Sequence, residues 1–147
     1  KFIMKRQLLF TPILGQYAYR LGCVPVNRGK GAAAIRKMVT DVASGRVAPG
    51  QLVIYPQGTR VAPGTKKVYK MGTGVLYREL QQECVPVALN TGLFWPKRSV
   101  MRKPGTATVE FMEPISKNRP VSEFMALMEQ AVEVRSRELM AEVGFYE

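Results

Sequence analysis

Short apolar runs alternate with segments of helical periodicity along the first part of the chain. The apolar runs, which favour strands, cover residues 1–6, 23–27, 51–56 and 85–89. The segments of helical periodicity between them cover residues 8–21, 32–43 and 69–82. This alternation is typical of βα units, so the sequence predicts an α/β fold with a mainly parallel central sheet flanked by helices. The run at 51–56 is continuous, which predicts a strand buried on both faces.

The last third of the chain follows another pattern. Residues 107–112 alternate as in a strand, and residues 121–143 have the spacing of one long amphipathic helix. A polar loop with Gly and Pro is expected at 57–67. The length of 147 residues suits a single domain that spans 1–147.

The composition excludes one large class of chemistry from these residues. The chain has no His. It therefore contains no Ser-His or Cys-His nucleophile pair, no imidazole general base and no imidazole metal ligand. It also has no apolar run near the roughly 20 residues that span a bilayer. The nearest stretch, 8–26, is interrupted by two Pro and by polar residues, and suits a helix that lies on a core or on a membrane.

Positive charge is concentrated in the first half of the sequence. The formal net charge is +11, and residues 1–70 hold 13 Lys or Arg but a single acid, Asp41. A half-chain this basic attracts polyanions, and the candidates are nucleic acid, an anionic membrane surface or a phosphorylated small substrate. A solvated basic face without a specific ligand is the alternative.

The strand predicted at 51–56 runs directly into Gln57, Gly58, Thr59 and Arg60. Gly allows a close approach of the backbone, Thr offers a hydroxyl, and the Arg fork suits phosphate or carboxylate. Open α/β sheets bind ligands at the carboxyl ends of their strands. The run that starts at residue 23 likewise ends in Asn and Arg28, so Arg28 and Arg60 are predicted to be neighbours at one edge of the sheet. Lys70 belongs to the lysines that extend this positive field, and an ordinary surface turn is the alternative.

These segments resemble the 1-acylglycerol-3-phosphate acyltransferase family, also called lysophosphatidic acid acyltransferases. Pro56-Gln57-Gly58-Thr59-Arg60 is similar to the Pro-Glu-Gly-Thr-Arg signature of that family. Further similar blocks stand in the order of the family at 24–28, 69–72, 85–87, 92–95 and 104–105. The ordered set covers residues 1 to about 115 and is far more specific than any single block.

The resemblance implies a glycerolipid acyltransferase-like fold and a role in phospholipid biosynthesis. The reaction it implies moves a fatty acyl group from acyl-CoA or acyl carrier protein to the free hydroxyl of a lysophospholipid, most favourably 1-acylglycerol-3-phosphate. The implied phosphate-binding residues are Arg28, Gln57, Gly58, Thr59, Arg60 and Lys70. No metal and no cofactor is needed, and the implied location is the cytoplasmic face of a bacterial inner membrane.

The resemblance also implies catalytic residues that these 147 residues lack. The family uses a His as general base on the acceptor hydroxyl, with an Asp five positions later that orients the imidazole. That pair is expected upstream of Lys1, so the domain is expected to be N-terminally truncated and inactive alone. Gln57 stands where the family usually has Glu, which removes a negative charge and could alter the choice of acceptor.

The segment at 94–98 combines Phe94 and Trp95 with Lys97 and Arg98. Aromatic rings and cations of this kind suit a membrane interface. The alternative is that Trp95 packs on the sheet. Two alternatives to the enzyme also stay open, a catalytically inactive lipid-binding homologue and a basic nucleic-acid-binding module. The latter is disfavoured, because the basic residues cluster around strand ends and amphipathic helices rather than among aromatic residues on an open surface.

Overall fold

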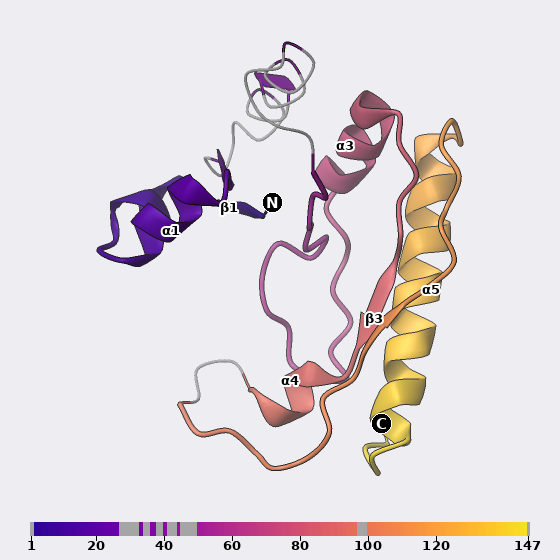
Figure 1. The fold of residues 1–147 in the computed structure, drawn as a ribbon. Coiled ribbons are helices and arrows are strands. Elements are labelled where there is room, and N and C mark those ends of the chain that lie inside the picture. The colour runs from indigo at the N-terminus through magenta and orange to yellow at the C-terminus, as the bar shows by residue number, and fades with distance from the viewer. Residues whose placement is uncertain are drawn as a thin grey trace. The chain divides into compact units, whose positions relative to one another are not determined.

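The fold is that of a computed structural model, which describes residues 2–26, 33, 36–37, 40, 44, 50–96 and 100–146. The chain divides into two compact units, Lys1–Tyr55 and Pro56–Glu147. Both mix helices and strands (Figure 1), which confirms the mixed α/β character. The assignment of residues 1–147 to a single domain stays a prediction.

The first unit contains a parallel pair of strands. β1 (Ile3–Lys5) pairs with β2 (Val24–Val26), with Ile3 opposite Val24 and Lys5 opposite Val26. Parallel strands cannot be joined by a tight hairpin. The connection here is helical, and consists of the 3₁₀ helix η1 (Arg6–Phe10) and helix α1 (Leu14–Arg20).

The single helix predicted at 8–21 is interrupted by Pro12. A proline lacks the N–H that would continue the helical hydrogen bonds. Ile13 then adopts a positive φ of 66°, and the N–H of Leu14 donates to the carbonyl oxygen of Pro12 at 2.7 Å. This tight γ-type turn separates η1 from α1.

The strand predicted at 51–56 is wrong in extent. The only pairing described there is an isolated parallel bridge between Phe2 and Val53, and Val53 and Tyr55 are exposed rather than buried on both faces. An apolar run shows that a segment can be buried, but it does not supply the paired strand that a ladder needs. Most of the helix predicted at 32–43 lies outside the described residues, and the part described, Ala33, Arg36, Lys37 and Thr40, is helical.

The second unit holds an antiparallel pair of strands. β3 (Val87–Leu89) pairs with β4 (Val109–Phe111), with Ala88 opposite Glu110. The mainly parallel central sheet is therefore not confirmed, because among the described residues only β1 and β2 form a parallel ladder. Alternation of apolar residues predicts strands but not the direction in which they pair.

Helix α5 (Val121–Ala141) covers one face of this sheet (Figure 1), as the sequence predicts for a long amphipathic helix. Ala88 and Glu110 lie on the covered face, and Ala88 is fully buried. The side chains of successive strand residues point to opposite faces. Leu89, Val109 and Phe111 accordingly lie on the other face and are exposed, so the strand predicted at 85–89 is covered on one face.

The core of the second unit lies where α5 meets α3 (Gly72–Leu80). The rings of Tyr77 and Phe124 are stacked there, with centroids 3.8 Å apart and planes 2° from parallel. Phe124 is fully buried, and a side chain of this size stabilises a fold by about 1.5–3 kcal/mol when it leaves water. The buried cluster consists of Tyr69, Tyr77, Phe124, Met125 and Met128.

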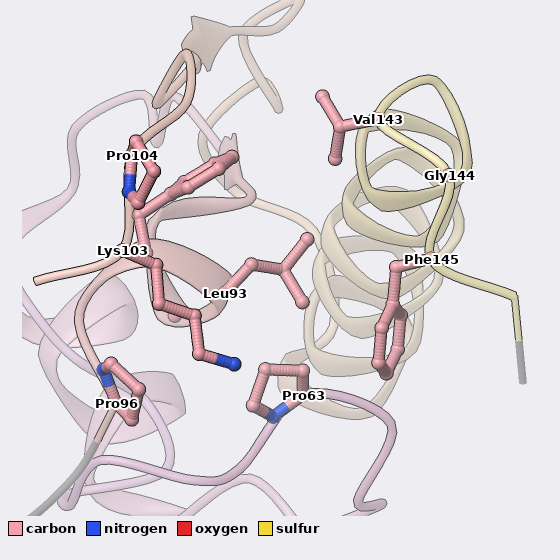
Figure 2. Close-up of a pocket in the computed structure, with 10 residues that line it drawn as sticks. Pro63, Leu93, Pro96, Lys103, Pro104, Val143, Gly144 and Phe145 are labelled. Carbon is pink, nitrogen blue, oxygen red and sulfur yellow. The ribbon is translucent and has the colours of Figure 1, made fainter.

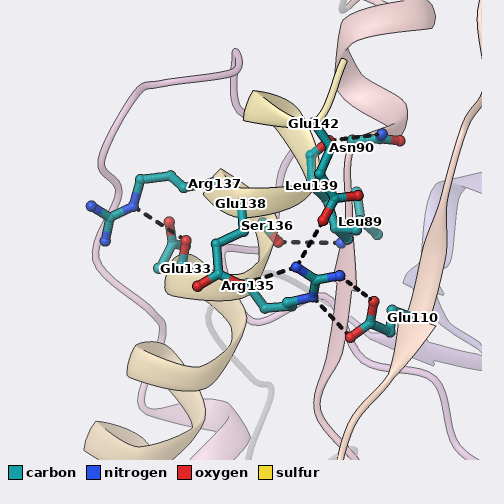
Figure 3. Close-up of polar contacts among 10 residues, drawn as sticks. All are labelled: Leu89, Asn90, Glu110, Glu133, Arg135, Ser136, Arg137, Glu138, Leu139 and Glu142. Carbon is teal, nitrogen blue, oxygen red and sulfur yellow. Dashed lines mark hydrogen bonds and ion pairs between the residues drawn. The ribbon is translucent and has the colours of Figure 1, made fainter. Parts of the chain in front are cut away.

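Polar contacts attach α5 to the sheet (Figure 3). The guanidinium of Arg135 donates from Nε and Nη2 to the two carboxylate oxygens of Glu110, at 2.9 and 2.8 Å. These bonds lower the pKa of the Glu110 carboxyl. Asn90, which is 1% exposed, donates to the carbonyl oxygen of Leu139 at 3.2 Å and accepts from the N–H of Thr108 at 2.7 Å. The Leu139 carbonyl is one of those that a helix end leaves without a partner, so Asn90 satisfies it from the end of β3.

A short helix, α4 (Thr91–Phe94), follows β3. None of the helices described in the two units is both long enough and apolar enough to cross a membrane.

The two glycines of α3 give a matched test of the contact between α3 and α5. A Cβ on Gly74 would lie 2.6 Å from Cγ1 of Val121, whereas a Cβ on Gly72 would have no atom within 4 Å. Gly74→Ala should therefore lower the free energy of unfolding, because overpacking costs about 1–3 kcal/mol and exceeds the helix-propensity gain of up to about 1 kcal/mol. Gly72→Ala should leave it unchanged or raise it by about 0.4–1 kcal/mol.

Thermal unfolding of the intact protein measures both variants. A Gly74→Ala protein as stable as Gly72→Ala would contradict the close approach of the two helices.

Candidate functional site

The turn from Pro56 to Arg60 opens the second unit, and its residues from Gln57 on lie in the loop that the sequence predicts at 57–67. Pro56 and Gln57 are in a turn, and Gly58 has a φ of +65°. This left-handed conformation is open to Gly and is strained for most other residues. The glycine of the motif therefore occurs at the position whose backbone conformation favours Gly.

Lys70 lies against this turn. Its backbone N–H donates to the carbonyl oxygen of Pro56 at 2.9 Å. Its side chain passes over Gly58, because a Cβ on Gly58 would lie 3.0 Å from both Cε and Nζ of Lys70. Gly58 thus provides a turn conformation and also the space that the lysine occupies. The structure brings together Gly58 and Lys70, two of the site residues predicted from sequence.

A carboxylate from α5 binds the same two segments. Nε2 of Gln57 donates to Oε1 of Glu133 at 3.3 Å, and the hydroxyl of Tyr69 donates to the same oxygen at 2.8 Å. Tyr69 is 5% exposed, and burial together with the hydrogen bond to Glu133 raises the pKa of its phenol well above the usual value. The phenol therefore stays protonated and remains a donor.

Sequence reasoning missed Glu133. The residue is 76 positions from Gln57, on a helix whose pattern predicts only an amphipathic face. The one signal available was the amide of Gln57, which is a donor as well as an acceptor and can therefore bind a carboxylate.

Arg60 and Lys70 give the turn its positive charge. Both side chains are exposed, and no carboxylate of a described residue forms an ion pair with either of them. Thr59 is half-buried between Gly58 and Arg60. A guanidinium fork and an ammonium at one exposed turn are suited to bind an anion such as a phosphate.

Three of the predicted site residues, Arg28, Lys97 and Arg98, lie outside the described residues. The predicted pairing of Arg28 with Arg60 at one sheet edge therefore stays a prediction.

The aromatic residues of the second predicted site take different places. Trp95 is 54% exposed, and Cζ of Arg102 lies 3.7 Å from the centroid of its ring, a cation–π contact. Both interpretations of Trp95, a membrane interface and packing on the sheet, stay predictions. Phe94 is half-buried, and Gly105 leaves the space for its ring, since a Cβ there would overlap Cε1 of Phe94.

A cavity of about 430 Å³ lies between the loops after β3 and the end of α5 (Figure 2). Its walls are mostly apolar and include Leu93, Phe94 and Phe145, while the amino group of Lys103 points toward Pro63. Among the predicted site residues that the structure describes, Phe94 alone lines this cavity, so the cavity is separate from the turn at 56–60.

The chain is similar to known proteins over the segment that contains this turn. The family model described as Acyltransferase matches residues 1–90, which is more than half of the chain. The protein named 1-acyl-sn-glycerol-3-phosphate acyltransferase from Pseudomonas aeruginosa is 25% identical over 142 residues, which cover 97% of this chain and 55% of that protein. The chain thus spans little more than half the length of this relative, and no solved structure matches it. The matched segment contains the turn at 56–60 and Lys70, and the resemblance of the motifs is confirmed: the chain belongs to the Acyltransferase family.

Proposed function

We propose that this protein transfers a fatty acyl group to the free hydroxyl of a lysophospholipid, with 1-acylglycerol-3-phosphate as the favoured acceptor. The observation that carries the proposal is the turn of Gln57, Gly58, Thr59 and Arg60 with Lys70 lying across it. Membership of the Acyltransferase family and the name of the Pseudomonas relative support the reaction type and the acceptor class.

In this proposal the turn binds the phosphate of the acceptor. Arg60 can offer two parallel N–H donors to phosphate oxygens, and Lys70 adds a second positive charge at the same turn. Arg28 is expected to join them, since it ends the block at 24–28 that resembles the family. The phosphate is on the carbon next to the one that bears the reacting hydroxyl and takes no part in the bond change, so these groups hold and orient the acceptor.

The reaction itself needs a base and a positioned thioester. The acceptor oxygen attacks the thioester carbonyl, a C–O bond forms and the C–S bond breaks, and the hydroxyl proton leaves through the base toward the departing thiolate. The 147 residues contain no His, so the proposal takes the imidazole base of the family from outside them. The donor is proposed to be acyl-CoA or acyl carrier protein.

We propose that the protein acts at a membrane surface, because lysophospholipids and their products are membrane lipids. Exposed Trp95 with Arg102 on its ring supports this, since amphipathic rings and cations favour the headgroup layer of anionic lipid. Phe94, Lys97 and Arg98 are proposed to belong to the same surface. The cytoplasmic face of a bacterial inner membrane remains the proposed location.

Arg60→Ala tests the acceptor site directly. The intact protein should acylate 1-acylglycerol-3-phosphate from an acyl thioester. Arg60→Ala should raise KM for this acceptor by about 10- to 100-fold, because the phosphate loses a hydrogen bond to a charged group. KM for 1-acylglycerol, which has no phosphate, should be the same in both proteins. The measurement is steady-state kinetics with the two acceptors.

Arg78→Ala is the control, because Arg78 is an exposed arginine on α3 that pairs with Glu79 rather than with the turn. An equal KM for the phosphorylated acceptor in the wild-type and Arg60→Ala proteins would refute the acceptor site.

Binding of this lipid without turnover would identify the inactive lipid-binding homologue, and binding of an oligonucleotide but not of the lipid would identify the nucleic-acid-binding module.

The membrane surface is tested by flotation with vesicles that contain an anionic phospholipid. A variant with Trp95→Ala, Lys97→Gln and Arg98→Gln should partition at least about tenfold less, since each basic residue near such a surface contributes about 1 kcal/mol and the ring adds to it. Tyr146→Ala removes another exposed aromatic ring and should float as the wild type does. Equal flotation of the triple variant and the wild type would remove the membrane role from this segment.

A further inference from the structure

We propose that Glu133 is a positioning residue for the acceptor phosphate, and that it holds the turn at 57–60 and the segment at 69–70 in register through Gln57 and Tyr69. This inference rests on the proposed function and extends it to a residue outside the family motifs. Glu133 is not a catalytic residue in this account, because it acts through its neighbours.

The geometry places one carboxylate oxygen at the junction of the two segments. Oε1 of Glu133 accepts from Gln57 at 3.3 Å and from Tyr69 at 2.8 Å. Hydrogen bonds to an ionised acceptor are roughly twice as strong as neutral ones. The two donors are sequence neighbours of Gly58 and Lys70, so the bonds restrain the residues that carry or border the positive charge.

The carboxylate is itself held by a fixed element. Two positions along α5, Arg135 is bound to Glu110, and one turn further along the helix Asn90 binds the carbonyl of Leu139. A site is more precise when the residue that supports it stands on a rigid element. Glu133 therefore transmits the position of α5 to a turn that has no helix or strand of its own.

Glu133 performs this role without neutralising the cations. Among the described residues its carboxylate forms no ion pair with Arg60 or Lys70. The N–H of Arg137 that reaches Glu133 donates to its backbone carbonyl at 3.3 Å and not to the carboxylate. The positive charge of the turn thus stays available to an anion while the turn is anchored.

The pairing of Gln57 with Glu133 permits an exchange of groups. Gln57→Glu alone places two carboxylates where a hydrogen bond now spans 3.3 Å, and like charges at this distance repel. The double variant Gln57→Glu with Glu133→Gln again has one amide and one carboxylate. In it the amide at position 133 donates to the carboxylate at position 57. Tyr69 can still donate a hydrogen bond to the amide oxygen of the new side chain at position 133.

The experiment compares steady-state acylation of 1-acylglycerol-3-phosphate by the intact wild-type protein and by these variants. Glu133→Ala and Gln57→Glu should each raise KM for the acceptor about tenfold and change kcat by less than about twofold, because the lost interaction is made equally in the ground state and the transition state. The double exchange should return KM to within about twofold of the wild type.

Glu129→Ala is the matched control, because Glu129 is an exposed acid one turn earlier on α5 that lies near enough to Tyr69 to act on it through charge but makes no hydrogen bond to it. It should leave KM unchanged. Thermal unfolding of each variant identifies any that fails to fold, and the exchange pair, which keeps both side-chain volumes, decides the question if Glu133→Ala does not fold.

Two outcomes overturn the inference in distinguishable ways. A wild-type protein that does not acylate the lipid overturns the proposed function and the inference with it. An active wild type whose KM is unchanged in Gln57→Glu, or is not recovered in the double exchange, overturns the role of Glu133 and leaves the proposed function intact.

Discussion

The position of α5 against the β3–β4 sheet is the constraint on which the second unit depends. The fork of Arg135 on Glu110 and the hydrogen bond from buried Asn90 to the Leu139 carbonyl fix the helix along the strands. The stack of Tyr77 on Phe124 then fixes α3 against the same helix. A shift of α5 by one residue would break the fork, take the Leu139 acceptor away from the Asn90 amide N–H and move Phe124 away from Tyr77. Because buried polar groups without partners are costly, this combination selects one register.

The candidate site depends on the same helix. The turn at 56–60 has no regular structure, yet Lys70 is held against it, because Lys70 bonds to Pro56 and passes over Gly58. Glu133 adds the contact that connects this turn to the fixed part of the unit. A flexible turn would lose conformational entropy when it bound a phosphate, and a turn that is already anchored loses less. Acceptor binding in the proposed function therefore depends on residues far from the motif in sequence.

The sequence predicts well what is local and poorly what depends on a distant partner. The periodicity of 121–143 predicts α5, and Gly58 within a polar segment predicts the turn, because both patterns follow from backbone geometry. The direction of the β3–β4 pair, the single bridge at Val53 and the contact with Glu133 arise from segments that meet only in the folded chain. The motif at 56–60 contains the residues that we propose bind the anion, whereas the residue that anchors the turn lies 76 positions from Gln57 and belongs to no motif.

The central claim is that the acceptor phosphate binds at the turn of Gly58, Thr59 and Arg60. A crystal structure of the intact protein with an unreactive 1-acylglycerol-3-phosphate analogue, in which hydrogen replaces the free hydroxyl, tests it most directly. The account predicts phosphate oxygens within hydrogen-bond distance of the Arg60 guanidinium and the Lys70 ammonium, with Gln57 and Tyr69 still bound to Glu133. A phosphate bound elsewhere, with Arg60 and Lys70 in solvent, would contradict it.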